Sequence, residues 1–151
     1  MARWDDDDWA ALVDGRRCPI CINGSPANVI ADIGCCWLTM GADAAPALPG
    51  TCALFVRRHV VEVHELRVEE ARDFIVAVQR VSKLLWELTG ATKINLELHG
   101  NTIPHLHMHF YPRYRGDPFE RTPINPQQSG TTADYVKHLA VRQRMIDRLA
   151  A

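Results

Sequence analysis

The chain has 151 residues, of which 47% are hydrophobic, and its formal net charge is -1 with the histidines neutral. This length suits one compact domain that buries enough apolar surface to fold without disulfides. The balanced charge argues against a broad cationic surface, and no apolar run approaches the roughly 18 residues of a membrane span, so neither nucleic acid nor a membrane is an expected partner.

The amino terminus and the cysteines indicate the compartment. The start of the chain, from Met1 to Asp8, lacks the basic and apolar regions of a secretory signal. The five cysteines form an odd set, which argues against a disulfide framework and favours reduced thiols or metal ligands. A cytoplasmic location is therefore expected.

Residues 1–17 are expected to form a tail or a short helix. Asp8 is the expected helix cap, and the apolar face would consist of Trp9, Leu12 and Val13. Cys18 and Cys21 follow with two residues between them, a spacing by which a loop offers two thiolates to one zinc ion. Two reduced thiols without a metal are the alternative.

Three strands are predicted next, over residues 28–33, 35–40 and 52–56. The first two are rich in Val, Ile, Cys and Trp, and Gly34 separates them, which predicts that they pair. Residues 41–50 are expected to form a loop that ends in the turn Pro49-Gly50. The cysteines within these strands are expected to be small core residues, namely Cys35, Cys36 and Cys52.

A long amphipathic helix is predicted over residues 68–89. Gly90 supplies a natural stop for it, and Glu69 and Glu70 suit the positive end of the helix dipole. The apolar positions recur with helical spacing at Ala71, Phe74, Ile75, Val78, Val81, Leu85 and Leu88.

A strand over 93–98, a turn at Gly100-Asn101 and an antiparallel strand through residues 105–111 follow this helix. Residues 116–130 are polar and rich in proline, which indicates a loop or arm, and residues 131–150 resume a helical pattern. On this last helix, His138 is expected to face solvent. The order of elements predicts an α+β fold, with an antiparallel sheet backed by one long helix and a C-terminal helix.

The strand through residues 105–111 carries three histidines at alternate positions, His105, His107 and His109. Side chains two apart on a strand share a face and lie about 7 Å apart, so one substrate group can contact two of these rings. Neutral imidazole is a nucleophile and proton carrier near neutral pH, since its ordinary pKa is about 6.5. The pattern therefore predicts a reactive face opposite a core face.

The segment His105-Leu106-His107-Met108-His109-Phe110-Tyr111 resembles the signature of the histidine triad (HIT) family, in which three histidines alternate with apolar residues. The resemblance covers roughly residues 18–115, which are expected to form the HIT domain, with the arm and last helix over 116–151. Flanking segments that also match are Pro49-Gly50, Arg58-His59-Val60, His64-Glu65-Leu66, Asn95, Gly100 and Pro112-Arg113.

The resemblance implies that the chain hydrolyses or transfers nucleotides from phosphoanhydrides or phosphoramidates, such as dinucleoside polyphosphates, as a homodimer with a continuous sheet. It implies that His107 is the nucleophile of a covalent nucleotidyl-histidine intermediate and that His109 contacts the phosphate and the leaving group. Asn101 is a candidate donor to the phosphate, because many relatives have Gln or Ser there, although a plain turn residue is equally expected. Thr51 replaces a histidine of many relatives, which leaves the base and ribose contacts open.

Some HIT relatives complete a zinc site with the histidine after the basic pair and the first histidine of the triad. Here these residues are His59 and His105, so the resemblance implies a structural zinc on Cys18, Cys21, His59 and His105. No redox cofactor is expected.

Two other functions fit parts of the sequence. Strands with alternating histidines also bind catalytic metals, which would make the chain a metal-dependent hydrolase. A sensor that binds nucleotides without turnover is the second alternative, and the change at Thr51 favours it. Arg113 and Arg115 are candidate contacts for small phosphorylated ligands in each case.

Overall fold

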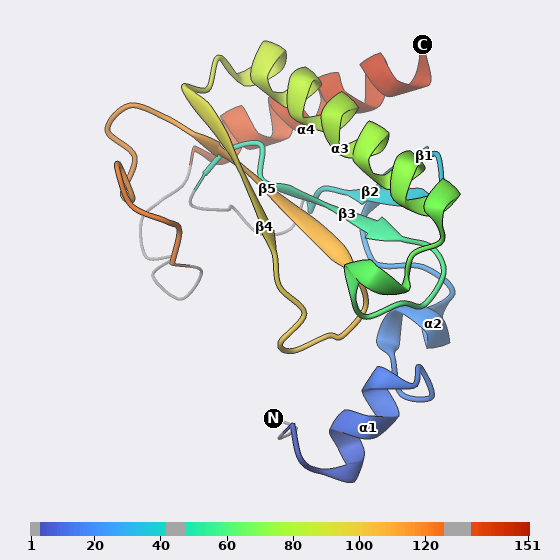
Figure 1. Ribbon diagram of the computed structural model, residues 1–151. Coiled ribbons are helices and arrows are strands. Elements are labelled where there is room, and N and C mark those ends of the chain that lie inside the picture. Colours follow the sequence, from blue (N-terminus) through green and yellow to red (C-terminus); the bar gives the residue numbers. More distant parts are fainter. Residues whose placement is uncertain (1–3, 42–47, 126–133) are drawn as a thin grey trace.

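The computed structural model describes residues 4–41, 48–125 and 134–151, which include a five-stranded antiparallel sheet (Figure 1). The sheet order is β1-β2-β3-β5-β4, and each neighbouring pair is antiparallel. The predicted α+β fold, with one long helix and a C-terminal helix, is confirmed. The strands are β1 (Val29–Ile33), β2 (Cys36–Thr39), β3 (Cys52–Val56), β4 (Lys93–Leu98) and β5 (His107–Arg113).

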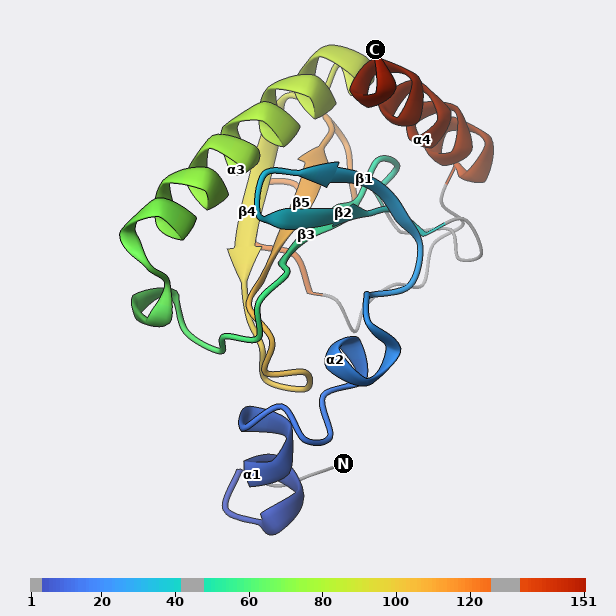
Figure 2. The same ribbon diagram turned by 90° about the vertical axis from the view of Figure 1, so that its right-hand side faces the viewer.

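The long helix α3 (Val68–Thr89) and the C-terminal helix α4 (Tyr135–Ala150) lie at one end of the molecule, while the short helices α1 (Asp7–Val13) and α2 (Pro19–Asn23) lie at the other (Figure 2). A single 3-10 turn, Val63–Glu65, precedes α3. Helix α3 ends where predicted, because Gly90 adopts the left-handed conformation with a φ of 66°. None of the described helices is long and apolar enough to cross a membrane.

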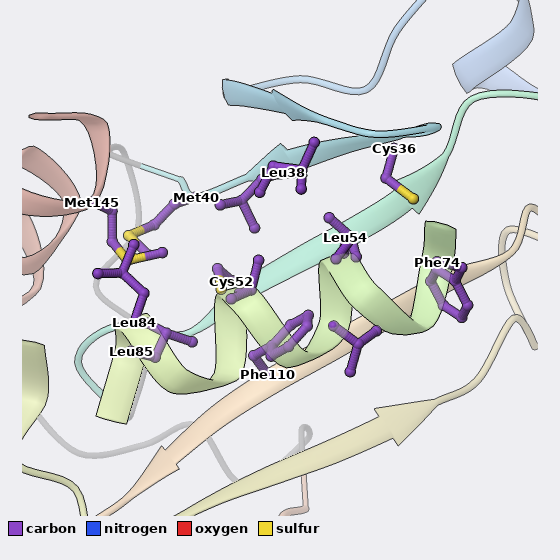
Figure 3. Close-up of a cluster of buried hydrophobic side chains, with 14 of the residues drawn as sticks. Cys36, Leu38, Met40, Cys52, Leu54, Phe74, Leu84, Leu85, Phe110 and Met145 are labelled. Atoms are coloured by element: carbon purple, nitrogen blue, oxygen red, sulfur yellow. The ribbon is translucent and has the colours of Figure 1, made fainter. Parts of the chain in front are cut away.

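The hydrophobic core lies between α3 and one face of the sheet (Figure 3). Side chains of α3 such as Phe74 and Leu85 pack with Leu38 of β2, Leu54 of β3 and Phe110 of β5. Burying each large apolar side chain is worth about 1.5–3 kcal/mol relative to exposure, so this contact layer holds the helix on the sheet.

The strand register turns the triad away from this core. Phe110 is fully buried in the core, so its neighbours along the strand, His109 and Tyr111, point to the opposite face. Opposite His107 lies Phe55 of β3, and His109 lies between Ala53 of β3 and Glu97 of β4.

Three local expectations differ from the structure. Asp6, not Asp8, caps α1, because its carboxylate accepts the Trp9 amide hydrogen at 2.8 Å. The Cys18–Cys21 segment is the start of helix α2 rather than a loop, with Pro19 in its first turn. Strand β5 begins at His107, so His105 lies just before it. Of the predicted C-terminal helix and arm, residues 126–133 lie outside the described residues.

The expectation that His138 faces solvent is wrong. This side chain is 1% exposed, and its Nδ1 accepts the Gly50 amide hydrogen at 3.0 Å while its Nε2 donates to the Gly41 carbonyl at 2.8 Å. The reason is that His138 shares one helical stripe with Val141 and Met145, and α4 turns that stripe toward the core.

Candidate functional site

His107 is the histidine whose environment suits a nucleophile. Its Nδ1 donates to the backbone carbonyl of His105 at 2.7 Å, and because a carbonyl only accepts, the proton is assigned to Nδ1. The lone pair then belongs to Nε2. The ring is 8% exposed, and burial lowers its pKa below the ordinary histidine value, so the neutral ring prevails at neutral pH.

Aromatic and imidazole rings fix the orientation of His107. The ring of Phe55 is stacked on it, with centroids 4.6 Å apart and an interplanar angle of 10°. The ring of His109 meets it edge to face at 4.7 Å and 75°. His107 is therefore held by one hydrogen bond and two ring contacts.

His109 is a neutral side chain at physiological pH. Burial, followed by the nearby His107 and His99, lowers the pKa of His109 to about 4. Its ring also stacks on Tyr111, with centroids 5.8 Å apart. A neutral imidazole has one N–H donor, so at this position it can donate one hydrogen bond to a phosphate oxygen or to a departing atom.

Asn101 is exposed to solvent. It occupies an exposed bend in the connection between Leu98 and His107, which is longer than the two-residue turn that the sequence indicates. Within the described residues, no hydrogen bond joins its side chain to the histidines. Its role as a donor to the phosphate stays a prediction.

The four predicted metal ligands come together. One atom each from Cys18, Cys21, His59 and His105 lies within 4.8 Å of the others. The Nδ1 atoms of His59 and His105 are 3.3 Å apart. Sulfur to nitrogen distances are 3.4 Å from Cys18 to His105, 3.3 Å from Cys21 to His59, and 3.9 Å from Cys21 to His105.

These separations fit one tetrahedral ion. Zinc bonds of about 2.0–2.1 Å to nitrogen and 2.3 Å to sulfur place the ligand atoms about 3.3–3.8 Å apart. The remaining ring nitrogens also fit, because the Nε2 of His59 donates to the Val13 carbonyl at 2.8 Å and that of His105 donates to the Val56 carbonyl at 2.7 Å. Both Nδ1 lone pairs therefore point at the cluster, as in protein metal sites. These four residues can hold a metal ion.

Gly15 allows the amino-terminal segment to approach this cluster. A Cβ atom there would lie 3.2 Å from Cδ2 of His59, and the backbone φ of 87° favours glycine. The close approach brings the Val13 carbonyl to His59. The segment before Cys18 thus contributes to the orientation of a ligand.

Arg113, a candidate contact for a phosphorylated ligand, is already paired with protein groups. The side chain of Arg113 is 11% exposed, and its guanidinium forms an ion pair with Asp117 at 2.9 Å. It also donates to Asn95 at 2.7 Å, to the Thr122 carbonyl at 2.9 Å and to the Phe119 carbonyl. Arg113 therefore fastens the segment after β5 to the sheet. Arg113 and Arg115 both line a cavity of about 660 Å³ beside β4.

Phe55 is a site residue that the sequence reasoning missed. Its only signal is the alternation of β3, which places residues 53 and 55 on the face opposite the buried Leu54. The alternation of β3 does not predict which residue of β5 lies opposite Phe55.

A model of the HIT domain family matches residues 25–116. A bis(5'-nucleosyl)-tetraphosphatase (asymmetrical) of Schizosaccharomyces pombe is 29% identical over 77 residues, which are 48% of this chain and 42% of that protein. A bifunctional bis(5'-adenosyl)-triphosphatase/adenylylsulfatase of Arabidopsis thaliana is 32% identical over 81 residues, 50% of this chain and 44% of that protein. The matched region is thus less than half the length of either relative.

Solved structures have the same fold. A histidine triad protein of Bradyrhizobium japonicum superposes with a TM-score of 0.65 and 26% identity, over 81% of this chain and 87% of that chain. A zinc-bound histidine triad family protein of Mycobacterium smegmatis has a TM-score of 0.56 and 21% identity, over 85% of this chain and 93% of that chain.

Proposed function

The chain belongs to the HIT domain family, and on this basis we propose that it hydrolyses nucleoside phosphoanhydrides or phosphoramidates through a covalent intermediate on His107. The observation that carries the proposal is the hydrogen bond from His107 Nδ1 to the His105 carbonyl, which leaves an Nε2 lone pair on a buried, neutral ring. Relatives named as dinucleoside polyphosphate hydrolases support the same substrate class.

In the first proposed step, the Nε2 lone pair of His107 attacks the α-phosphorus. A bond forms between nitrogen and phosphorus, the bond from phosphorus to the bridging oxygen or nitrogen breaks, and the leaving group departs with that electron pair. Neutral imidazole needs no prior deprotonation for this attack. The proposed contact of His109 with the departing atom offers that atom a hydrogen bond.

In the second step, water attacks phosphorus, the bond to His107 breaks with its electron pair returning to Nε2, and the attacking water releases one proton to solvent. The products are a nucleoside monophosphate and the free neutral ring. Covalent catalysis accelerates a reaction because it replaces one difficult displacement by two easier ones. Asn101 is retained as a proposed donor to the phosphate oxygens.

We also propose that Cys18, Cys21, His59 and His105 hold a structural zinc ion. Supporting it are the ligand separations and the zinc-bound family member. When bound, the ion would neutralise the two thiolates and tie helix α2 to the segment before β5. The triad itself would not bind a catalytic metal in this arrangement, because His105 faces the cysteines and His107 Nδ1 faces a carbonyl.

A homodimer is proposed as the working assembly. Strand β4 lies at one edge of the sheet, so one side of its backbone has no neighbouring strand within the described residues. Leu96 on this strand is 44% exposed. Antiparallel pairing of two β4 strands would continue the sheet and cover this leucine.

The test of the function is incubation with diadenosine polyphosphates and with an adenosine phosphoramidate, following nucleoside monophosphate by chromatography. Single-turnover conditions separate an enzyme from a nucleotide sensor, since a sensor yields no product. A nucleotidyl adduct on His107 after acid or denaturant quenching is the expected result. Absence of product from every substrate would refute the proposal.

A further inference from the structure

We infer that Phe55 is a positioning residue for His107: its parallel ring holds the plane of the nucleophilic imidazole. The inference rests on the proposed function, in which His107 attacks phosphorus. Its basis is the stacked pair, with centroids 4.6 Å apart and planes within 10° of each other. This geometry is the closest and most nearly parallel of the ring contacts of His107.

The strand register creates this pair. Phe55 and His107 are Cα partners on β3 and β5, and Trp37 of β2 is the partner of Phe55 on its other side. The three rings therefore lie in one row across the sheet, on the face that α3 does not cover. At the far end of the row, the Arg57 guanidinium lies 5.8 Å from the Trp37 ring centroid and pairs with Asp32 at 3.1 Å.

Phe55 is not required by the hydrophobic core. Its neighbours along β3, Leu54 and Val56, are fully buried members of the core cluster, whereas Phe55 is half-buried and lies outside that cluster. A large aromatic side chain on the reactive face therefore has a use other than packing beneath α3. Its nearest ring neighbour is the nucleophile.

The stack supplies a restraint that the hydrogen bond lacks. A single bond from Nδ1 to the His105 carbonyl fixes one atom of the ring but lets the ring rock about that contact. A parallel ring at 4.6 Å blocks the rocking on one side, while His109 lies edge-on at another. In-line attack depends on the direction of the Nε2 lone pair, and small misalignments of reacting groups cost large factors in rate.

The experiment compares Phe55→Leu with Phe55→Tyr and with the matched control Phe74→Leu. Leucine keeps apolar volume but removes the ring, tyrosine keeps the ring, and Phe74 lies in the core on the opposite side of the sheet. For F55L we expect kcat for diadenosine polyphosphate hydrolysis to fall about tenfold with KM nearly unchanged. F55Y should restore kcat to within about twofold, and F74L should keep the wild-type kcat.

A second measurement does not require turnover. The ring protons of His107, assigned by long-range proton–nitrogen NMR spectra, should be shifted upfield by the Phe55 ring in the wild type and in F55Y. In F55L this shift should disappear, while F74L should retain it. If F55L does not fold, Phe55→Met provides the second variant without a ring.

The outcomes separate the two claims. A wild-type protein without turnover would refute the proposed function, and the NMR shifts would still decide whether Phe55 holds the ring. Unchanged kcat in F55L, or a raised KM with unchanged kcat, would overturn the positioning role. Unchanged His107 ring shifts in F55L would overturn it as well.

Discussion

The backbone carbonyl of His105 accepts the Nδ1 hydrogen of His107 at 2.7 Å, while the side chain of the same His105 faces Cys18 at 3.4 Å. One residue thus joins the candidate nucleophile to the candidate metal site. A shift of His105 would move the carbonyl that sets the tautomer of His107. The two sites are adjacent and share a structural element.

Replacement of His107 by Asn should abolish hydrolysis, by a factor of roughly a thousand or more, because no other group would form the covalent intermediate. Initial rates and quench-trapping of the nucleotidyl adduct measure this loss. Exposed His64 gives the matched control, and H64N should retain the wild-type rate. Full activity in H107N would remove His107 from the mechanism.

Loss of the metal site should lower thermal stability. Replacing Cys21, the exposed ligand, by Ser removes one thiolate, so we expect less than the wild-type zinc content and a Tm lower by roughly 5–10 °C. Elemental analysis and thermal unfolding with and without a chelator provide the measurements. Half-buried Cys35 lies outside the cluster, so the C35S variant should have the zinc content of the wild type. Equal zinc in C21S and wild type would contradict the ligand assignment.

The pH dependence of stability should contain a contribution from His109. Its folded-state pKa is about 4, below the ordinary value of 6.5, so the unfolded chain takes up the proton first as the pH falls. This contribution to stability is fully present above about pH 6.5 and is lost as the pH falls toward 4.

Replacing His109 by Gln removes that titrating group. Chemical unfolding between pH 4 and 7 should therefore give a shallower loss of stability for H109Q than for the wild type. Parallel curves for the two proteins would show that His109 titrates alike in the folded and unfolded chain.

The ion pair between Arg113 and Asp117 should matter for stability. Their side chains are 11% and 3% exposed, so Asp117→Asn would leave a buried guanidinium without its counter-charge. We expect a loss of about 3 kcal/mol in the free energy of unfolding, measured in urea. Exposed Lys83, which pairs with Glu87, is the control, and K83Q should change stability by less than about 0.5 kcal/mol. Similar values for the two variants would argue against a structural role for Arg113.

A lysine at Leu96 should weaken the proposed dimer. An added charge on an edge strand opposes pairing with another edge. Sedimentation of the wild type should give twice the mass of one chain. For L96K the measured mass should shift toward that of a single chain. A wild type that sediments as a single chain at all concentrations would refute the dimer.

The amphipathic periodicity of residues 68–89 predicted the extent of helix α3 and its end at Gly90, but Ile75 of the predicted stripe is exposed. The Cys18 and Cys21 spacing, with the family resemblance, predicted the four-residue cluster. The stack of Phe55 on His107 was not predictable, because it depends on how β3 pairs with a strand about fifty residues later, and a slip of one residue would reverse the face. His138 was misjudged because the docking of α4, rather than its local polarity, decides its burial.

Strand β5 lies between β3 and β4 and is hydrogen-bonded on both sides. Fraying at the outer strand β1 or detachment of α1 would leave its ladders intact, so His107 and His109 should keep their arrangement through such local openings. Amide hydrogens of residues 108–110 should exchange with solvent only when the domain as a whole unfolds. Strand β5 should thereby be among the most persistent parts of the molecule, and a substrate of the proposed reaction would reach His107 through movement of side chains and loops rather than of the sheet.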